Sequence, residues 1–239
     1  MNRQGVWAVI PARGGSKSIK RKNLMTVNGY SLLERTIRAA QNSVSIDHVV
    51  VTTDDLEIMS LSSSYGARVL RRPDYLSTDT ASSESAVLHA INELGLIESG
   101  VEYIALLQCT SPFTTPDDIN KVFNYLQLSG CSSAFSCVEW HGFLWDRSGH
   151  GINHNHLAPR ARRQDLPPTL LETGAVYFFS AKEFMKTGSR FCMPTLPVKI
   201  DSFPLEVDDP LDLLTADTLS RSSLFKDWLS QELGSRDPA

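Results

Sequence analysis

Short apolar runs alternate with longer amphipathic stretches over the first half of the chain. The apolar runs have the length of buried strands and lie at residues 6–10, 49–52, 68–70 and 103–107. The amphipathic stretches carry apolar side chains three and four positions apart, as helices do, and lie at residues 31–40, 56–65, 85–94 and 117–128. This alternation predicts an α/β fold of the doubly wound class, with a mostly parallel sheet, helices on both faces and right-handed crossovers.

The alternation stops near Val138 and resumes near residue 174. Residues 139–170 hold three prolines, four of the six histidines and two of the four tryptophans, which indicates an inserted excursion rather than another β-α unit. We therefore interpret residues 1–239 as one domain that carries this excursion. After it, strands are expected at residues 174–179 and 193–200, and helices at residues 210–219 and 224–233.

The composition is that of an ordinary globular protein: 239 residues, 41% apolar and 21% charged, with a formal net charge of -4. These values argue against disordered, collagen-like and membrane-embedded chains. Slight acidity without a long basic tail disfavours a dedicated nucleic-acid-binding protein. The four cysteines lack C-x-x-C or zinc-finger spacing, so we expect free thiols. The apolar stretch at residues 6–11 is too short for a signal peptide or a membrane span, and we expect a cytoplasmic protein.

The loop after the first predicted strand is rich in glycine and basic residues. Residues 11–23 read PARGGSKSIKRKN, with five basic side chains among the eleven positions of residues 13–23. Two glycines let backbone N–H groups turn inward while Lys and Arg supply charge, so the pattern predicts a polyphosphate-binding loop. The loop departs from the Walker pattern because Lys17 follows the glycine pair too soon. The alternative is a solvated basic turn.

Polar side chains also follow other predicted strands, where a doubly wound sheet binds its ligands. Arg72, Ser82 and Ser83 belong to a Ser/Thr-rich segment that suits a nucleotide, although its hydroxyls could equally cap the helix that follows. Gln108 comes directly after a buried strand, so its side chain should emerge at the C-terminal edge of the sheet and is a candidate for ligand binding. Ser111 could instead serve to end that strand. An aspartate such as Asp54, at a strand-to-helix junction, is interpreted first as a helix cap.

Two carboxylates near the end of the chain form a candidate metal site. Glu206 and Asp208 are two positions apart on an extended segment, so both point to one face. Oxygen ligands of this kind hold Mg²⁺ together with substrate phosphates. The competing interpretation is an N-cap before Pro210, and we assign capping to Asp209 and metal binding to Asp208.

Ordered motifs along nearly the whole chain resemble those of the cytidylyltransferases that activate nonulosonic acids, of which acylneuraminate cytidylyltransferase (CMP-sialic acid synthetase) is the best known. The motifs are IPARGGSK at residues 10–17 with KN at 22–23, VTTDD at 51–55, RRP at 71–73, STDTASS at 77–83, LLQCTSP at 106–112, RQDLP at 163–167, ETGAVY at 172–177 and LEVDD at 205–209. The resemblance implies a Rossmann-like nucleotidyltransferase fold and the transfer of CMP from CTP to the anomeric hydroxyl of a nonulosonic acid, with release of pyrophosphate. It also implies Mg²⁺ as cofactor.

The same resemblance assigns roles to individual residues. Catalytic roles fall to Arg13, Lys22 and Gln108. Binding of CTP and the sugar acid falls to Ala12, Gly14, Ser16, Lys17, Asn23, Arg72, Ser83 and Arg163. The metal ligands are Glu206 and Asp208, and no general base is evident. A 3-deoxy-octulosonate-type cytidylyltransferase is the leading alternative enzyme, and a noncatalytic nucleotide-binding protein on the same fold is the alternative from another class.

Differences from the family pattern gather on the sugar side. They are Ser18, Thr114, Leu171 and Thr173. They leave the acceptor open among sialic acid, its deaminated relative, legionaminic acid, pseudaminic acid and other ulosonic acids. By resemblance, the excursion at residues 139–170 packs on a second subunit of a homodimer, where Arg163 serves the neighbouring site. Trp140, Phe143 and Trp145 give it an apolar patch that agrees with a buried interface.

Overall fold

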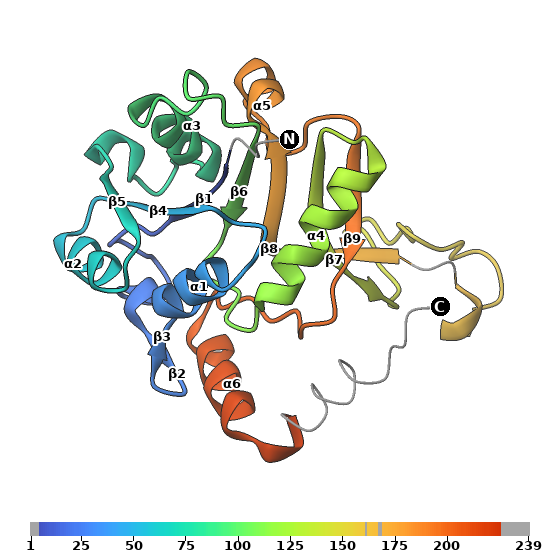
Figure 1. Cartoon of the computed structure of the whole chain (residues 1–239). Helices are drawn as coiled ribbons and strands as arrows, with labels where there is room; N and C mark the ends of the chain where they lie inside the picture. Colours follow the sequence, from blue (N-terminus) through green and yellow to red (C-terminus); the bar gives the residue numbers. More distant parts are fainter. Residues whose placement is uncertain (1–4, 161, 167–168, 226–239) are drawn as a thin grey trace.

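A seven-stranded sheet forms the centre of the computed structural model, which describes residues 5–160, 162–166 and 169–225 (Figure 1). From one edge to the other the strands are β5 (Arg68–Arg71), β4 (His48–Thr53), β1 (Val6–Pro11), β6 (Tyr103–Leu107), β8 (Thr169–Ser180), β7 (Ser133–Trp140) and β9 (Thr195–Lys199). The pairs from β5 to β6 are parallel, and so is the pair of β7 with β9. Only β8 runs antiparallel to its neighbours within this sheet of the described chain. The predicted doubly wound, mostly parallel α/β fold is confirmed.

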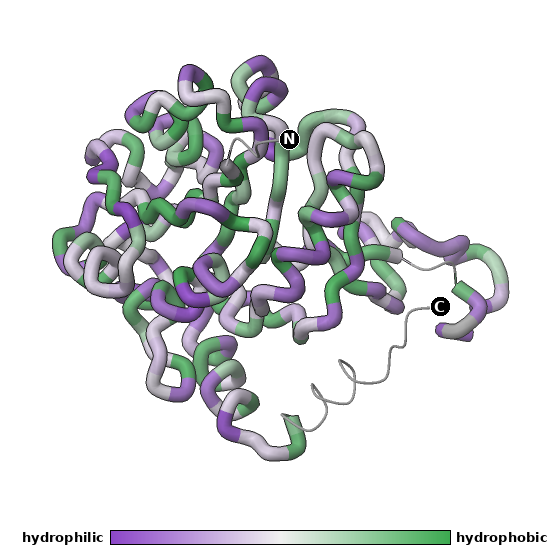
Figure 2. The backbone as a smooth tube through the Cα atoms, viewed as in Figure 1, coloured by the Kyte–Doolittle hydropathy of each residue, from purple (hydrophilic) through white to green (hydrophobic). Residues whose placement is uncertain are grey.

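Helices cover both faces of the sheet, because its strands are apolar on both sides. One apolar cluster packs α1 (Leu32–Gln41), α2 (Leu56–Ser64), α4 (Pro116–Ser129) and α6 (Pro210–Arg221) on one side. A second cluster packs α3 (Ser83–Glu93) and α5 (Ala181–Thr187) on the other. Figure 2 shows hydrophobic residues along the central strands and hydrophilic residues along the outer helices and loops. In the described ranges, no helix has the length and apolar character needed to cross a bilayer.

The strands and helices predicted at residues 6–219 are confirmed, with β8 beginning at Thr169 rather than at residue 174, and four strands or helices were not predicted. The missed elements are β7, α5 and a small hairpin of β2 (Thr26–Val27) and β3 (Tyr30–Ser31). Strand β7 was not predicted because two of its buried positions are serines. Ser133 donates to the carbonyl of Cys192 at 2.7 Å, and the hydroxyls of Ser136 and Thr173 form a hydrogen bond at 2.6 Å. Satisfied hydroxyls of this kind hide a buried strand from a hydrophobicity pattern. Most of the helix predicted at 224–233 lies outside the described residues.

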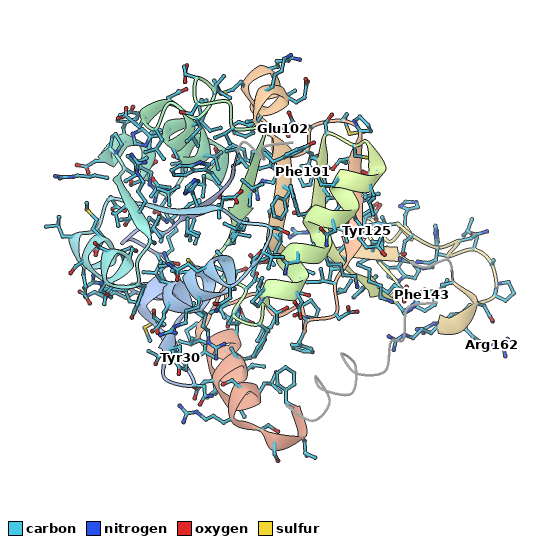
Figure 3. The ribbon with its side chains drawn as sticks, in the orientation of Figure 1. Tyr30, Glu102, Tyr125, Phe143, Arg162 and Phe191 are labelled. Atoms are coloured by element: carbon cyan, nitrogen blue, oxygen red, sulfur yellow. The ribbon has the colours of Figure 1, made fainter. Side chains whose placement is uncertain are left out.

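The excursion leaves the sheet between β7 and β8 and projects from one side of the molecule (Figures 1 and 3). Phe143 and Arg162, labelled in Figure 3, lie on it, apart from the helices of the main body. Its own aromatic groups pack together, with the ring centroids of Phe143 and Trp145 each 4.9 Å from that of His154. A pocket of about 910 Å³, open to solvent, is lined by excursion residues alone. The four cysteines of the chain are free, as predicted.

Candidate active site

Loops from the C-terminal ends of β1, β5 and β6 meet around a pocket of about 340 Å³. This edge of a doubly wound sheet is where ligands bind, because the loops there converge from several strands. The pocket brings together many of the residues predicted for CTP binding: Arg13, Ser16, Lys17, Lys22, Asn23, Arg72 and Ser83. Thr110, Asp79 and Ser82 also line it. The separate motifs therefore form one polar, mainly basic hollow.

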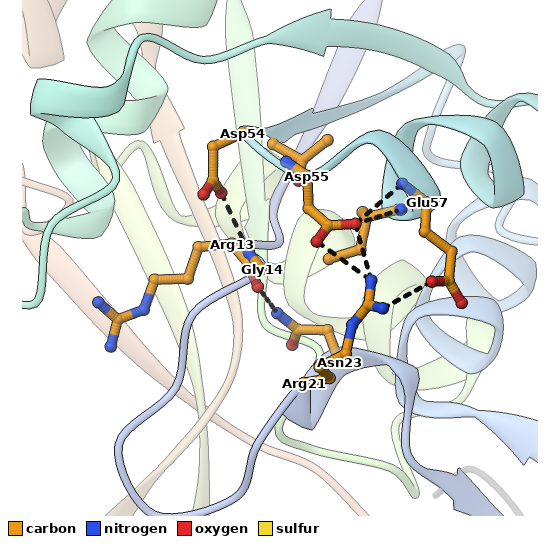
Figure 4. Close-up of polar contacts among 9 residues, drawn as sticks. Arg13, Gly14, Arg21, Asn23, Asp54, Asp55 and Glu57 are labelled. Atoms are coloured by element: carbon orange, nitrogen blue, oxygen red, sulfur yellow. Dashed lines mark hydrogen bonds and ion pairs between the residues drawn. The ribbon is translucent and has the colours of Figure 1, made fainter.

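The basic loop is tied to the rest of the fold by side chains that fix its path (Figure 4). The amide of Asn23 donates to the carbonyl of Arg13 at 3.0 Å, which closes the base of the loop. Arg21 has a left-handed backbone with φ of 58° and forms ion pairs with Asp55 at 3.0 Å and Glu57 at 2.7 Å. The loop is therefore held against the start of α2, and the short 3-10 turn η1 (Lys22–Leu24) begins from a fixed residue.

The interpretation of Asp54 as the cap of α2 is wrong. The cap is Asp55, whose carboxylate accepts hydrogen bonds from the backbone N–H groups of Glu57 at 2.9 Å and Ile58 at 3.0 Å. Asp54 instead accepts a hydrogen bond from the N–H of Gly14 at 3.0 Å and so positions the loop. An aspartate does cap the helix at this strand-to-helix junction. Two aspartates are adjacent there, and only the position of the basic loop shows which one caps the helix.

Gly14 is required by its contact with Asp55. A β-carbon there would lie 2.7 Å from a carboxylate oxygen of Asp55, whereas one on Gly15 would meet nothing within 4 Å. Because Asp55 is held by α2 and Arg21, it cannot yield, and we expect Gly14→Ala to lower the melting temperature by about 2–4 °C or more. Gly15→Ala is the matched control, and a thermal melt of the free proteins compares them. Equal melting temperatures for both variants and the wild type would contradict the contact.

Two loop cations share one carboxylate. Arg13 donates to Asp79 at 2.8 Å and to the carbonyl of Thr78 at 2.9 Å, while Lys17 lies 3.5 Å from the second oxygen of Asp79. These groups are partly exposed, so the ion pairs are weak and exchangeable. Asp79 was not predicted as part of the site, although it sits within the Ser/Thr-rich motif. In this structure Asp79 pairs with Arg13 and Lys17, the two cations that a polyphosphate would bind.

Arg72 carries the clearest sign of an anion-binding role. Only 4% of its surface is exposed, and its Nε and Nη2 have no hydrogen-bond partner among the described residues. Burial lowers the pKa of the guanidinium, opposed by Asp54, and the nearby charge of Arg13 adds to the lowering. A buried cation with unpaired donors destabilises the fold, so its presence on the pocket wall favours an anionic ligand.

The late acidic segment reaches the basic loop. The Nζ of Lys22 donates to the carbonyl of Val207 at 2.9 Å and lies 3.1 Å from the Oδ1 of Asp208. Ser18 donates to the carbonyl of Asp208. On the other side, the N–H of Val207 donates to the carbonyl of Thr110 at 2.7 Å, and the hydroxyl of Thr110 donates to Glu206 at 3.3 Å. The segment is thus fixed between β6 and the loop.

The carboxylates of Glu206 and Asp208 suit a divalent cation. Burial raises the pKa of Glu206, and the negative charge of Asp208 raises it further. A cation between them would relieve both effects, and Lys22 already neutralises part of that charge. In the described part of the chain, no group of three or more His, Cys, Asp or Glu side chains forms a complete cage. Two carboxylates together with substrate phosphates form a usual coordination shell of Mg²⁺.

The prediction that Asp209 caps α6 is confirmed, because its carboxylate accepts a hydrogen bond from the N–H of Leu211 at 2.7 Å.

The raised pKa of Glu206 has a measurable consequence for stability. A carboxyl whose pKa is higher in the folded state than in the unfolded state loses folding stability as the pH rises between the two values. The unfolded value is near 4.5, so at neutral pH ionised Glu206 destabilises the metal-free fold. We expect Glu206→Gln to melt higher than wild type at pH 7 in EDTA, with the difference shrinking towards pH 4.5. Glu98→Gln, in an exposed loop, is the control. A lower melting temperature for Glu206→Gln at pH 7 would refute this account.

The remaining predicted residues divide into those near the pocket and one far from it. Ala12 is buried and donates its N–H to Thr52 at 3.0 Å, and half-buried Gln108 follows β6 and donates its N–H to Ala175 at 3.2 Å. Ser111 is buried and contacts the carbonyl of Thr173 at 3.5 Å, which agrees with its structural interpretation. Arg163 lies on the excursion and lines the pocket there. A single chain therefore does not bring Arg163 to the other predicted site residues.

Comparison with known proteins agrees with this geometry. Residues 7–193 match the model of the cytidylyltransferase family. The chain belongs to this family. It is 38% identical over 182 residues to N-acylneuraminate cytidylyltransferase B of Danio rerio, covering 73% of this chain and 42% of that protein. It is 30% identical over 217 residues to the CMP-N,N'-diacetyllegionaminic acid synthase of Legionella pneumophila, covering 87% and 92%. The predicted resemblance to the acylneuraminate cytidylyltransferases is confirmed.

The fold also has solved counterparts. A CMP:2-keto-3-deoxy-manno-octonic acid synthetase complexed with CTP superposes with a TM-score of 0.67 at 16% identity, covering 90% of this chain and 98% of the other. A 4-diphosphocytidyl-2C-methyl-D-erythritol synthase from Anaerococcus prevotii gives 0.64 at 12% identity, covering 91% and 96%. These likenesses establish the nucleotidyltransferase fold. The chain spans less than half the length of the Danio rerio cytidylyltransferase that it matches.

Proposed function

We propose that this protein transfers CMP from CTP to the anomeric hydroxyl of a nonulosonic acid and releases pyrophosphate. The observation that carries the proposal is the convergence of Lys22 on Val207 and Asp208, which joins a basic glycine loop to a pair of carboxylates. Such a pairing suits a triphosphate that enters with a divalent cation. Relatives named for acylneuraminate, diacetyllegionaminic acid and pseudaminic acid support the acceptor class.

The chain's own groups account for positioning and charge neutralisation. The oxygen of the anomeric hydroxyl attacks the α-phosphorus and gives up its proton to solvent, the bond from that phosphorus to the bridging oxygen breaks, and pyrophosphate leaves with the electron pair. Because charge develops on the phosphate oxygens, preorganised cations stabilise the transition state. Arg13, Lys17 and Arg72 would bind the triphosphate in the 340 Å³ pocket, and Lys22 would contact it at the acidic edge. Gln108 would orient the acceptor hydroxyl for attack.

Binding of CTP would exchange partners within the loop. Asp79 holds Arg13 at 2.8 Å in the free protein, and a triphosphate would replace it with oxygens of higher charge. Ser83, which lines the pocket from the first turn of α3, would contact the nucleoside. Ala12 is fully buried and would act by holding the start of the loop through its N–H bond to Thr52. Asn23 would keep the loop closed through its bond to the Arg13 carbonyl.

Mg²⁺ is the proposed cofactor, held by Glu206 and Asp208. When bound, it would polarise the α-phosphate and neutralise charge on its oxygens. Glu206 is kept in place by the hydroxyl of Thr110 at 3.3 Å, and Asp208 by the Nζ of Lys22 at 3.1 Å. These contacts restrict the movement of each carboxylate.

The decisive experiment measures pyrophosphate release from CTP with and without Mg²⁺. The acids compared should be N-acetylneuraminic, diacetyllegionaminic and pseudaminic acids, with 3-deoxy-octulosonic acid as the alternative acceptor. Release that needs both the metal and a nonulosonic acid supports the proposal. Pyrophosphate release with 3-deoxy-octulosonic acid but with no nonulosonic acid would show that the acceptor belongs to the octulosonate class instead. Binding of CTP without turnover of any acid would favour a noncatalytic nucleotide-binding protein.

We further propose a homodimer formed through the excursion. Trp145, Ile152 and Leu157 are more than half exposed there, at 54%, 64% and 86%, which is an apolar surface suited to a second copy. Arg163 on the same excursion would then approach the neighbouring site and bind the substrate carboxylate with its guanidinium fork. Sedimentation should give twice the mass of the chain, and a monomer at assay concentrations would refute the dimer.

A cytoplasmic setting completes the proposal. Its support is chemical: Cys109, Cys131, Cys137 and Cys192 are all free, and unpaired thiols of this kind are maintained in reducing compartments. Burial raises the pKa of the Cys109 thiol to about 12, so this group stays protonated and unreactive.

A further inference from the structure

An exposed carboxylate at the rim of the site is held by a buried tyrosine. Tyr177 lies on β8 opposite Leu106 of β6, and only 2% of its surface is exposed. Its hydroxyl donates to the Oε1 of Glu172, which is exposed on the same strand. Exposed carboxylates are ordinarily free to rotate, whereas the buried Tyr177 hydroxyl holds the Glu172 carboxylate in one orientation.

The local path of β8 creates this contact. In a regular strand, residues five apart point to opposite faces. Here the pairing with β7 shifts between Phe135 and Cys137: a step of two positions along β7 corresponds to a step of five along β8, from Tyr177 to Glu172. Gly174, with φ of 69°, provides the left-handed turn within the irregularity. The bulge brings Glu172 onto the side of the Tyr177 hydroxyl.

Further groups hold the tyrosine ring in place. The guanidinium of Arg190 lies 4.6 Å from the ring centroid of Tyr177, and its Nε donates to Glu84 at 2.5 Å. The ring of Phe191 meets Tyr177 edge-on at 5.9 Å. Burial raises the pKa of the Tyr177 hydroxyl, and the charge of Glu172 raises it further, so the hydroxyl remains a donor at neutral pH. The carboxylate of Glu172 is therefore aimed by a rigid assembly.

Glu172 also lies beside the groups assigned to the chemistry. Gly174, two residues on, approaches Glu206 so closely that a β-carbon would lie 3.0 Å from its carboxylate oxygens. Next along the strand, the carbonyl of Ala175 accepts the N–H of Gln108 at 3.2 Å. Glu84, at the other end of the assembly, is in the first turn of α3 beside Ser83 of the nucleotide pocket. The assembly thus runs from the first turn of α3, beside the proposed nucleotide pocket, to the Glu172 carboxylate on β8.

We propose that Glu172 is an acceptor-specificity residue, whose carboxylate accepts a hydrogen bond from a hydroxyl or acylamino N–H of the sugar acid. This inference rests on the proposed function. A carboxylate only accepts hydrogen bonds, so it selects substituents that donate and rejects those that do not. Because Tyr177 fixes the carboxylate before the acid arrives, little ordering remains to oppose binding. Tyr177, Arg190 and Glu84 act through Glu172 and are positioning residues.

The test compares Glu172→Ala, Tyr177→Phe and the double variant in the full-length protein. Glu172→Ala should raise the KM for the preferred acid about tenfold, with the KM for CTP unchanged, because a hydrogen bond to a charged group is lost. Tyr177→Phe keeps the ring and should raise the same KM by a smaller factor. In the Glu172→Ala background it should have no further effect, since the hydroxyl acts only through the carboxylate.

Controls separate specificity from folding. Tyr103→Phe removes a hydroxyl at the opposite end of β6 and should leave both KM values unchanged. N-acetylneuraminic acid and its deaminated analogue, which carries a hydroxyl in place of the acylamino group, identify the donor: a larger effect of Glu172→Ala on one of them assigns the N–H or the O–H.

Two results would overturn the inference while leaving the proposed function intact. The first is an active wild type whose Glu172→Ala variant keeps its KM for every acid. The second is Tyr177→Phe lowering only the melting temperature, or adding its full effect to that of Glu172→Ala. A wild type that releases no pyrophosphate with any nonulosonic acid would overturn both proposals.

Discussion

Lys22→Ala is expected to lower the rate of pyrophosphate release from CTP by about 100-fold or more, which corresponds to the loss of one preorganised charge in the site. The Nζ of Lys22 lies 3.1 Å from Asp208 and 2.9 Å from the carbonyl of Val207, so it is the cation nearest the proposed metal-binding pair in the contacts described above. Its removal leaves the carboxylates without a counter-charge and the triphosphate without a partner. Steady-state kinetics of pyrophosphate release measures the effect.

Asp208→Ala should lose activity to a similar degree, because Asp208 contacts Lys22 and is a proposed metal ligand. Lys20→Ala is the matched control: Lys20 is exposed on the same loop and should retain wild-type turnover. Turnover close to wild type in both Lys22→Ala and Asp208→Ala would remove these residues from the mechanism. A loss in Lys20→Ala equal to that in Lys22→Ala would point instead to the overall charge of the loop.

Arg72→Met is expected to weaken CTP binding by about 100-fold without lowering the melting temperature of the free protein. The side chain is buried at 4% exposure, and two of its nitrogens have no hydrogen-bond partner in the part of the chain that the structure describes, so its charge stabilises a bound anion but not the free fold. Methionine fills a similar volume and requires no hydrogen bonds. Calorimetric titration with CTP and Mg²⁺ gives the affinity, and a thermal melt without ligand gives the stability.

The neighbouring arginine provides the control for this experiment. Arg71 is exposed at the end of β5, and Arg71→Met should change neither the affinity for CTP nor the melting temperature. If Arg72→Met unfolds the protein at a much lower temperature while the remaining folded protein binds CTP normally, then Arg72 is a structural residue and its unpaired nitrogens have another partner in solution.

Much of the fold could be predicted because apolar spacing reports directly on which faces are buried. Strand β6 reads as an uninterrupted apolar run, and α1 places Leu33, Ile37 and Ala40 on one stripe, so both were predicted to within a residue or two. Strand β7 was missed because Ser133 and Ser136 are buried with their hydroxyls paired. A pattern of hydrophobicity cannot distinguish a satisfied buried serine from an exposed one.

The site was predictable to the extent that topology dictates it. Loops at the C-terminal ends of parallel strands gather at one edge of the sheet. The family motifs placed Lys22 and Asp208, 186 positions apart, in one site, and the structure brings them into contact. The division of labour between Asp54 and Asp55 was not predictable, because both follow the same strand and either can cap a helix. Asp79 was likewise overlooked, since nothing in its neighbourhood along the chain shows that Arg13 and Lys17 approach it.

Local spacing and residue chemistry alone predicted most of the strands and helices, and they made the first loop a candidate phosphate-binding site and Glu206 and Asp208 candidate metal ligands. These properties depend on neighbours within a few positions or on rules that hold for every doubly wound sheet. Only the tertiary structure decided which aspartate holds Gly14, that Arg72 is buried with unpaired nitrogens, that Arg163 lies apart on the excursion, and that a bulge in β8 aims Tyr177 at Glu172. Each of these depends on the distance between segments remote in sequence, which packing sets and composition does not.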